Sequence, residues 1–183
     1  GEVPAPIGSS HHTNLPVGAY QGSDSLYLQI HCASQAFHDK LMRLLEAEVP
    51  GLEEMSSDPR FTTQDARIAN RDDLHSVLAQ AFSTKTRKEW EQLFEEWDIP
   101  GGPINDIGEA LTDPQVQFRN MVVEIDHTKA GRYKTAGNPI KIGYPVHEMR
   151  PPPTLGEHVE LILGQLLGHS SEHIRLLKEK KIV

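Results

Sequence analysis

Three consecutive prolines, Pro151 to Pro153, divide this 183-residue sequence near its C-terminus. Each proline ring fixes φ and removes a backbone donor, so neither a helix nor a central strand runs through the segment, and an extended rod is favoured. The sequence therefore predicts a folded body before Arg150, a linker at residues 150–153, and a separate element after it.

Beyond the linker, apolar residues recur at helical spacing until Gly168. Ser170 is a suitable N-cap for a second helix, whose cationic C-terminal end suits the helix dipole. We predict two C-terminal helices and expect this apolar pair to dock on something outside residues 1–150. The first helix has its apolar stripe at Leu155, Val159, Ile162, Leu163, Leu166 and Leu167.

The body is predicted to be mainly helical. Thr86 and Glu89 form a capping box ahead of Trp90, Leu93, Phe94 and Trp97, which lie on one helical face. The predicted helices are a helix capped by Ser34 and ending near Glu48, a short helix from Gln64, a helix capped by Asn70 and reaching Phe82, the helix behind the capping box, and two short helices near 106–111 and 114–119.

Alternating apolar residues predict short strands at 26–30, 121–126, 131–135 and 138–142, the last three forming an antiparallel meander. Residues 1–25 are expected to be loop, and Ile99 to Pro103 a break between elements. The expected fold class is α+β: helices packed with a small antiparallel sheet, followed by a proline-rich linker and two C-terminal helices.

Composition excludes several functions. The formal net charge is −8, which argues against a nucleic-acid surface, and no apolar run is long enough to span a bilayer. We therefore expect no nucleic-acid partner and no membrane. No signal peptide is visible, and the single cysteine, Cys32, cannot form an internal disulfide. These features predict a reducing, cytoplasmic location.

Few residues suggest chemistry on their own. Adjacent His11 and His12 chelate one metal poorly in an extended loop, and no further ligand follows at a recognised spacing, so no metal site is expected. Cys32 follows an apolar strand, which favours a buried, inert thiol. Neighbouring acidic pairs do not face each other on a helix and are interpreted as solvated. The residues alone indicate an α+β module without a complete active site.

Five short motifs, in this order, nevertheless resemble the C-terminal half of the family III CoA-transferases, also called the CaiB/BaiF family. Each motif is weak alone, and their order and separations make the match specific. The motifs are His11-x-x-x-x-Pro16-x-Gly18-Ala19-Tyr20; Asp58-Pro59-Arg60-Phe61 followed by Asn70-Arg71; Ile99-Pro100-Gly101-Gly102-Pro103-Ile104-Asn105; Asp113-Pro114-Gln115-Val116 with Met121-Val122-Val123-Glu124; and Arg150-Pro151-Pro152-Pro153-x-Leu155-Gly156-Glu157-His158.

The resemblance implies an enzyme that moves CoA between carboxylic acids. In this family an N-terminal Rossmann-like domain binds CoA and supplies an aspartate, which attacks the acyl-CoA and passes through a mixed anhydride to an aspartyl-CoA thioester. A small α+β domain follows, and the chain then returns to the large domain. Two such subunits interlock as a homodimer. Coenzyme A is a substrate, and no bound cofactor is expected in this chain.

Carried onto this sequence, the resemblance places a linker or loop at residues 1–19, the small domain at 20–149, and the proline linker with the returning helices at 150–183. The start at Gly1 without Met predicts a fragment that lacks the CoA-binding domain and is inactive alone. No catalytic residue is expected in this chain, because the family aspartate would precede Gly1. The substrate-facing loop would contain Gly8, His11, His12, Thr13 and Asn14.

Two alternatives stay open at this point. One is a fragment of an α-methylacyl-CoA racemase relative, although Ser34 stands where that branch carries a glutamate. The other is a stand-alone module that binds a partner protein through its apolar C-terminal helices. A mitochondrial matrix location is also compatible with a sequence that lacks its N-terminal part.

Overall fold

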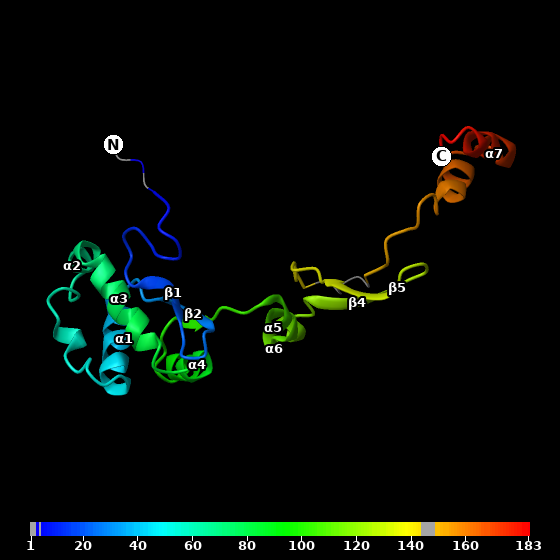
Figure 1. The fold of residues 1–183 in the computed structure, drawn as a ribbon. Helices are drawn as coiled ribbons and strands as arrows, with labels where there is room; N and C mark the ends of the chain where they lie inside the picture. Colours follow the sequence, from blue (N-terminus) through cyan, green and yellow to red (C-terminus); the bar gives the residue numbers. More distant parts are fainter. Residues whose placement is uncertain (1–2, 4, 144–148) are drawn as a thin grey trace. The chain divides into compact units, whose positions relative to one another are not determined.

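The computed structural model describes residue 3 and residues 5–143 and 149–183 (Figure 1). Its internal contacts divide the chain into two units, Gly1–Asp106 and Ile107–Val183, and each unit is described by itself. Parts of two predictions, the loop at residues 1, 2 and 4 and the small domain at 144–148, lie outside the described residues. The fold class is α+β, as predicted.

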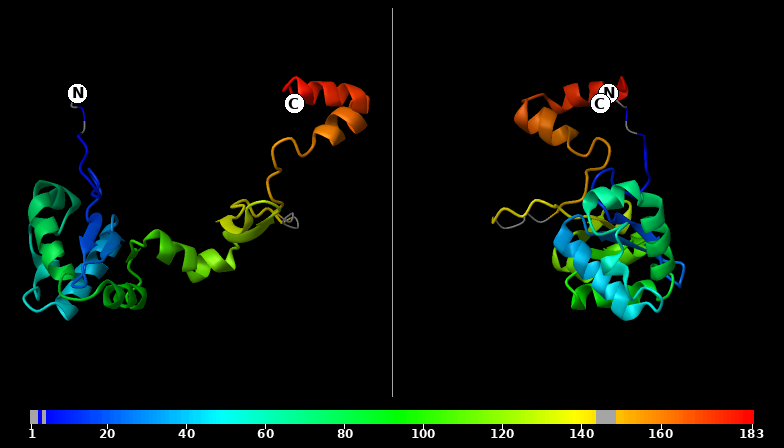
Figure 2. Two further views of the ribbon diagram at one scale, coloured as in Figure 1. Left: turned by 45° about the vertical axis from the view of Figure 1, so that its right-hand side comes forward. Right: turned by 90° about the vertical axis from the view of Figure 1, so that its left-hand side faces the viewer.

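The first unit combines helices with one short sheet. Its elements are β1 (Val17–Gln21), β2 (Tyr27–His31), α1 (Gln35–Glu48), the 3₁₀ turn η1 (Met55–Ser57), α2 (Gln64–Ala69), α3 (Arg71–Phe82), α4 (Arg87–Glu96) and β3 (Gly101–Pro103). The three strands are antiparallel in the order β1-β2-β3. Figures 1 and 2 show α1, α3 and α4 gathered around these strands.

Two of these strands correct the sequence prediction. β1 lies within the expected loop 1–25, and β3 occupies the expected break, where Gly101 pairs with Ile30. Neither segment alternates apolar and polar residues clearly, because β1 is buried along most of its length and β3 is formed by Gly-Gly-Pro. Gly101 also has no room for a side chain, since an added Cβ would lie 2.8 Å from the Phe94 ring. Close packing, rather than strand propensity, accounts for this glycine.

The core of the first unit is aromatic. Trp90 and Phe94 of α4 are buried against Phe82 of α3, with ring centroids 5.0 Å apart for Phe82–Trp90 and 6.0 Å for Phe82–Phe94. Tyr20 of β1 joins the same cluster, 5.0 Å from Phe82. The predicted stripe on α4 is therefore confirmed as core, and it ties two helices to the sheet.

Helix starts follow the predicted caps, with one exception. The Ser34 hydroxyl accepts from the Phe37 amide at 3.3 Å, and the Thr86–Glu89 capping box is complete. Asn70 precedes α3 without a side-chain cap and instead donates to the Ala66 carbonyl at 2.9 Å. Its side chain therefore closes the end of α2, because the two helices follow each other directly.

The second unit contains smaller elements: α5 (Ile107–Thr112), α6 (Pro114–Phe118), β4 (Val122–His127), β5 (Gly131–Ala136), η2 (Glu160–Leu166) and α7 (Ser171–Glu179). β4 and β5 form a two-stranded antiparallel hairpin. The predicted third strand at 138–142 is absent from the described residues, and Ile140 and Ile142 are exposed there. The Asn138 side chain accepts from the Ile140 amide at 2.9 Å, which turns the chain after Pro139 instead of extending it.

The two C-terminal helices differ from the prediction in one detail. η2 is a π-helix, in which the Leu167 amide donates to the Ile162 carbonyl five residues earlier at 3.0 Å. An apolar stripe over so short a segment does not distinguish this wider pitch from an α-helix. Ile174 of α7 is buried, and Lys178 reaches Glu160 of η2 at 2.8 Å.

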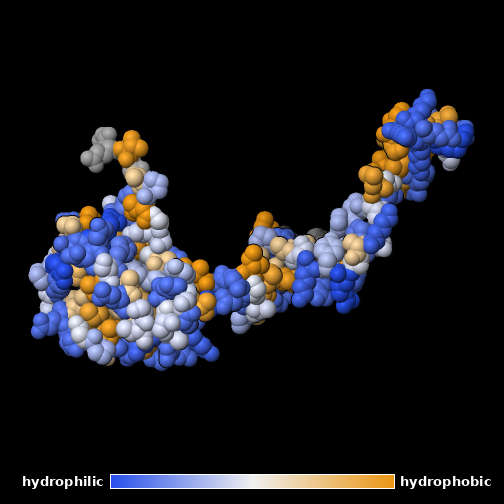
Figure 3. All heavy atoms as spheres, in the orientation of Figure 1, coloured by the Kyte–Doolittle hydropathy of each residue, from blue (hydrophilic) through white to orange (hydrophobic). Residues whose placement is uncertain are grey.

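Many apolar side chains of this segment remain exposed, as the orange atoms of the C-terminal helices show (Figure 3). Leu166 is 72% exposed and Leu167 is 62% exposed. Leu155, Leu161 and Ile162 are exposed as well. Within the described residues of the second unit, the helices thus leave an apolar face exposed.

One buried polar group stands out in the first unit. His38 of α1 is 1% exposed, and its Nε2 atom has no hydrogen-bond partner among the described residues. Burial, with help from the charge of Arg67, lowers the pKa of His38 to about 4. The folded chain therefore holds this imidazole neutral where an unfolded chain would protonate it.

His38 is expected to make stability pH-dependent. Between its ordinary pKa of 6.5 and the folded value of about 4, the unfolded chain binds a proton that the folded chain excludes, so stability falls as the pH falls through this range. The shift corresponds to about 3 kcal/mol at most. Urea unfolding at pH 7 and pH 4 should show a smaller loss for His38→Gln than for wild type. The exposed His31→Gln variant is the control, and equal losses in all three proteins would contradict the prediction.

Candidate functional site

The candidate site is the loop that enters β1. The side chains of His11, His12, Thr13 and Asn14 are exposed, as is Gly8, which has a left-handed φ of +68°. The following residues 15–18 are buried. The five residues singled out in the sequence therefore lie on one loop at the surface of the first unit.

Helices α2 and α3 hold this loop by its backbone carbonyls. Arg71 donates to the carbonyl of His11 at 2.7 Å and to that of His12, and Gln64 donates to the carbonyl of Thr13. These bonds occupy the backbone acceptors of the loop with helix side chains. The helices thus hold the loop through its backbone, and the side chains of residues 11–14 stay exposed.

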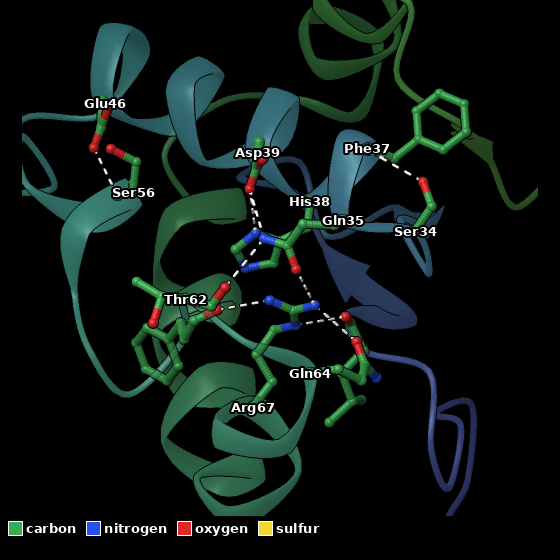
Figure 4. A network of polar contacts seen from close by, with 12 residues as sticks. Ser34, Gln35, Phe37, His38, Asp39, Glu46, Ser56, Thr62, Gln64 and Arg67 are labelled. Atoms are coloured by element: carbon green, nitrogen blue, oxygen red, sulfur yellow. Dashed lines mark hydrogen bonds and ion pairs between the residues drawn. The ribbon is translucent and has the colours of Figure 1, made fainter.

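Arg67 anchors the point where the loop becomes β1. Its guanidinium is 1% exposed and donates to the carbonyls of Leu15 at 2.9 Å and Phe61 at 2.8 Å. It also donates to the side-chain oxygens of Gln64 at 2.7 Å and Gln35 at 3.0 Å (Figure 4). All four hydrogen-bond acceptors are neutral dipoles; burial lowers the pKa of Arg67, and the charge of Asp39 acts in the opposite direction.

His11 orders the loop from within. Its Nδ1 atom accepts from the amide of Thr13 at 3.2 Å and from the amide of Asn14 at 3.0 Å. The imidazole thereby satisfies two amides that no strand or helix serves. His11 is the one predicted site residue whose side chain has a visible structural role in the loop.

A chain of three hydroxyl and imidazole groups lies beneath the loop. The Tyr20 hydroxyl is 2.7 Å from His75 Nδ1, and His75 Nε2 is 2.8 Å from the Ser10 hydroxyl. Arg71 donates to the same Ser10 oxygen at 3.3 Å. Burial raises the pKa of Tyr20, whereas burial and the charge of Arg71 lower the pKa of His75. Tyr20 is therefore protonated and His75 neutral near pH 7.

Gly18 explains how Tyr20 and His75 fit so closely. An added Cβ at this position would lie 3.2 Å from the Tyr20 hydroxyl and 3.3 Å from the His75 ring. A side chain there would have to push both groups. The Gly18-Ala19-Tyr20 motif thus leaves space for the hydrogen bond beneath the loop.

Cys32 is a buried thiol, as predicted. It is 0% exposed, and burial raises its pKa to about 12. A thiol held protonated in this way is a poor nucleophile. Cys32 lies at the end of β2 as part of the core.

The sequence alone did not indicate the residues that hold the loop. Gln64 and Arg67 lie three residues apart on α2, and Arg71 and His75 lie four residues apart on α3, so each pair shares a face of its own helix. The signal was therefore present, but polar residues on a helix usually face solvent. Only the position of the loop reveals that these faces are covered.

Two observations concern ligands and membranes. Within the described part of the chain, no group of three or more His, Cys, Asp or Glu residues is placed to hold a metal ion. No helix in the same residues combines the length and apolar character needed to cross a bilayer. The candidate site consists of the loop, the side chains of Gln64, Arg67 and Arg71 that hold it (the polar clamp), and the hydrogen-bonded pair of buried Tyr20 and half-buried His75.

Comparison with known proteins identifies the family. The family model for CoA-transferase family III matches residues 1–159. The chain belongs to CoA-transferase family III. A fungal relative, an acyl-CoA transferase of Fusarium pseudograminearum, is 34% identical over 179 residues, which cover 96% of this chain and 38% of that protein.

Two further family III relatives agree with this assignment. The human succinyl-CoA:glutarate CoA-transferase is 27% identical and matches 96% of this chain and 39% of its own length. The crystal structure of a CAIB/BAIF family protein from Brucella suis superimposes with a TM-score of 0.69 at 27% identity, covering 90% of this chain and 41% of that one. This family III chain thus spans about two fifths of the length of these relatives.

Replacing Arg67 should destabilise the first unit strongly. Arg67→Lys removes the planar fork and leaves buried carbonyls without donors, which is expected to cost at least about 2 kcal/mol in the free energy of unfolding. The matched control is Arg60→Lys, because Arg60 pairs with Asp58 and Asp73 while its side chain is 48% exposed. That variant is expected to cost less than about 1 kcal/mol in the same denaturant titration. Equal costs would refute the anchoring role.

The His11 side chain should order the loop without stabilising the fold. In His11→Ala, hydrogen exchange at the Thr13 and Asn14 amides is expected to accelerate, because both lose their acceptor. Tm should change little, since His11 is exposed. His11→Asn supplies another short-range acceptor and should restore part of the protection. Unchanged exchange in His11→Ala would show that the imidazole does not hold the loop.

Proposed function

We propose that this chain is the C-terminal part of a CoA-transferase that moves CoA between carboxylic acids. The observation that carries the proposal is the family III match over residues 1–159, together with a chain that spans about two fifths of its relatives. Residues 20–149 would act as the small domain, and residues 150–183 as the segment that returns to a CoA-binding domain.

In the proposed reaction, an aspartate outside this chain attacks the thioester carbonyl of an acyl-CoA and releases the CoA thiolate. The thiolate then attacks the aspartyl carbonyl of the mixed anhydride, which frees the donor acid and leaves an aspartyl-CoA thioester. The acceptor carboxylate takes CoA by the reverse sequence. This chain would contribute the loop containing Gly8, His11, His12, Thr13 and Asn14.

The loop is suited to that task. Its backbone is held from one side by Gln64 and Arg71, whereas its side chains are exposed on the other. A loop fixed in this way presents polar groups to a ligand with little further ordering, which lowers the cost of binding. We infer that it closes one wall of the substrate site.

The exposed apolar face of η2 and α7 supports the proposed domain partner. Leu166 and Leu167 are more than half exposed, and an exposed apolar face of this kind is typical of an interaction surface. The proposed cover is the CoA-binding domain, in an enzyme that functions as a homodimer. The Fusarium pseudograminearum and human relatives reported above are both named as transferases, which favours a transferase over the racemase alternative.

The isolated chain is expected neither to transfer CoA nor to bind it tightly. CoA phosphates require helix N-termini or clustered cations, and this chain carries a net charge of −8. Calorimetric titration with CoA and acetyl-CoA is the measurement, and succinyl-CoA:glutarate exchange is the activity assay. Adding the proposed CoA-binding domain as a separate polypeptide should restore exchange.

A dissociation constant near micromolar for the chain alone, about −8 kcal/mol, would contradict this proposal. It would mean that a self-sufficient CoA site exists within residues 1–183. Failure of the recombined protein to transfer CoA between any pair of small acids would also count against it.

A further inference from the structure

The Ser10 hydroxyl has an unusual set of neighbours. His75 Nε2 lies 2.8 Å away on one side, and Arg71 donates to the same oxygen at 3.3 Å. Ser10 itself is partly exposed and lies between Gly8 and His11 on the loop. What this hydroxyl can do depends on which of its neighbours donates.

Tyr20 fixes that choice. Its side chain is buried, and among the described residues its hydroxyl has one hydrogen-bond partner, His75 Nδ1, at 2.7 Å. A buried, protonated phenol needs an acceptor for its hydrogen, because leaving that hydrogen unpaired is costly. Tyr20 therefore donates to Nδ1, and neutral His75 must carry its proton on Nε2.

The proton on Nε2 then points along the chain to Ser10. His75 donates to the Ser10 oxygen, and Arg71 donates to it as well, so both acceptor positions of the hydroxyl are filled. The hydrogen of Ser10 is directed to neither neighbour. It is left as a donor on the exposed side of the loop.

The charge around Ser10 favours an anionic acceptor. Arg71 makes its contacts with the neutral carbonyls of His11 and His12 and with Ser10, and it has no ion pair among the described residues. The charge of Arg71 lowers the pKa of His75 by more than the charge of Asp72 raises it. A guanidinium that forms no ion pair among the described residues, next to a hydroxyl that is free to donate, suits a carboxylate oxygen.

We propose that Ser10 binds a carboxylate oxygen of the acid substrate, and that Tyr20 and His75 are positioning residues that aim its hydroxyl. The proposal rests on the CoA-transferase function proposed above, because it takes the acceptor acid as the ligand. Ser10 acts by binding, and no bond is formed or broken at its oxygen.

The first test reads the tautomer of His75 in the 183-residue chain. Nitrogen-15 spectra of the imidazole rings distinguish a proton on Nε2 from one on Nδ1. Wild type should show the Nε2 form, and Tyr20→Phe, which keeps the ring packing against Phe82, should show the Nδ1 form gaining population. A wild-type Nδ1 form would make Ser10 donate to His75 and would overturn the proposal.

The second test reads the ligand in the same chain. Sodium glutarate in the millimolar range should shift the amide signals of residues 9–12 saturably in wild type and in Ser10→Thr, which keeps the hydroxyl. The shift should be lost in Ser10→Ala. Sodium chloride at equal ionic strength is the control, and equal responses to both salts, or to glutarate in all variants, would refute carboxylate binding.

The third test separates this inference from the proposed function. In the enzyme restored with its CoA-binding domain, Ser10→Ala should raise KM for the acceptor acid about tenfold or more, with a smaller effect on KM for acyl-CoA. Ser9→Ala removes a hydroxyl that accepts from the Ala19 amide and is the matched control. An active wild-type enzyme in which Ser10→Ala leaves the acceptor KM unchanged refutes the inference alone. Failure of wild type to transfer CoA refutes the proposed function, and the glutarate titration then decides the role of Ser10 independently.

Discussion

The arrangement of the first unit depends on one buried cation. Arg67 is placed by α2 and reaches α1 through Gln35, the preceding turn through Phe61, and the start of β1 through Leu15. These segments are far apart in sequence, and the guanidinium joins them without a carboxylate partner. Because a buried charge is costly unless its donors are satisfied, the surrounding carbonyls must converge on it. The position of the loop at β1 follows from that requirement.

Helices α2 and α3 together carry the rest of the site. Above Arg67, Gln64 and Arg71 hold the loop by its carbonyls, and His75 links the loop to the buried Tyr20. The interior thus provides both the support for the loop and a fixed proton arrangement beneath it. The backbone of the loop is bound to the helices, whereas the exposed side chains of residues 11–14 are available to a ligand.

Local signals in the sequence predicted the helices and the strands β2, β4 and β5, but they did not predict β1 and β3. The caps at Ser34 and Thr86 and the stripe through Trp90 and Phe94 are short-range patterns, and the structure confirms them. β1 and β3 depend on pairing with β2, which no local pattern of Gly-Gly-Pro indicates. The five motifs indicated the family from sequence alone. The loop-holding role of Gln64, Arg67 and Arg71 was not predicted, because polar residues on a helix usually face solvent. The substrate-facing role of residues 8–14 stays a prediction, since it concerns a ligand rather than the fold.

Because Gln64 and Arg71 hold the loop by its backbone carbonyls, the loop can tolerate substitutions of its side chains during evolution. Every residue has a backbone carbonyl. Hydrogen bonds from Gln64 and Arg71 to the loop carbonyls therefore do not depend on which side chains the loop residues carry. Residues 12 to 14 can therefore exchange one side chain for another while Gln64 and Arg71 keep their partners. If the loop lines the substrate site as proposed, recognition of a different acid would require few compensating changes in the core. In a scaffold of this kind, the loop side chains that would contact a substrate can change while the fold that supports them stays the same.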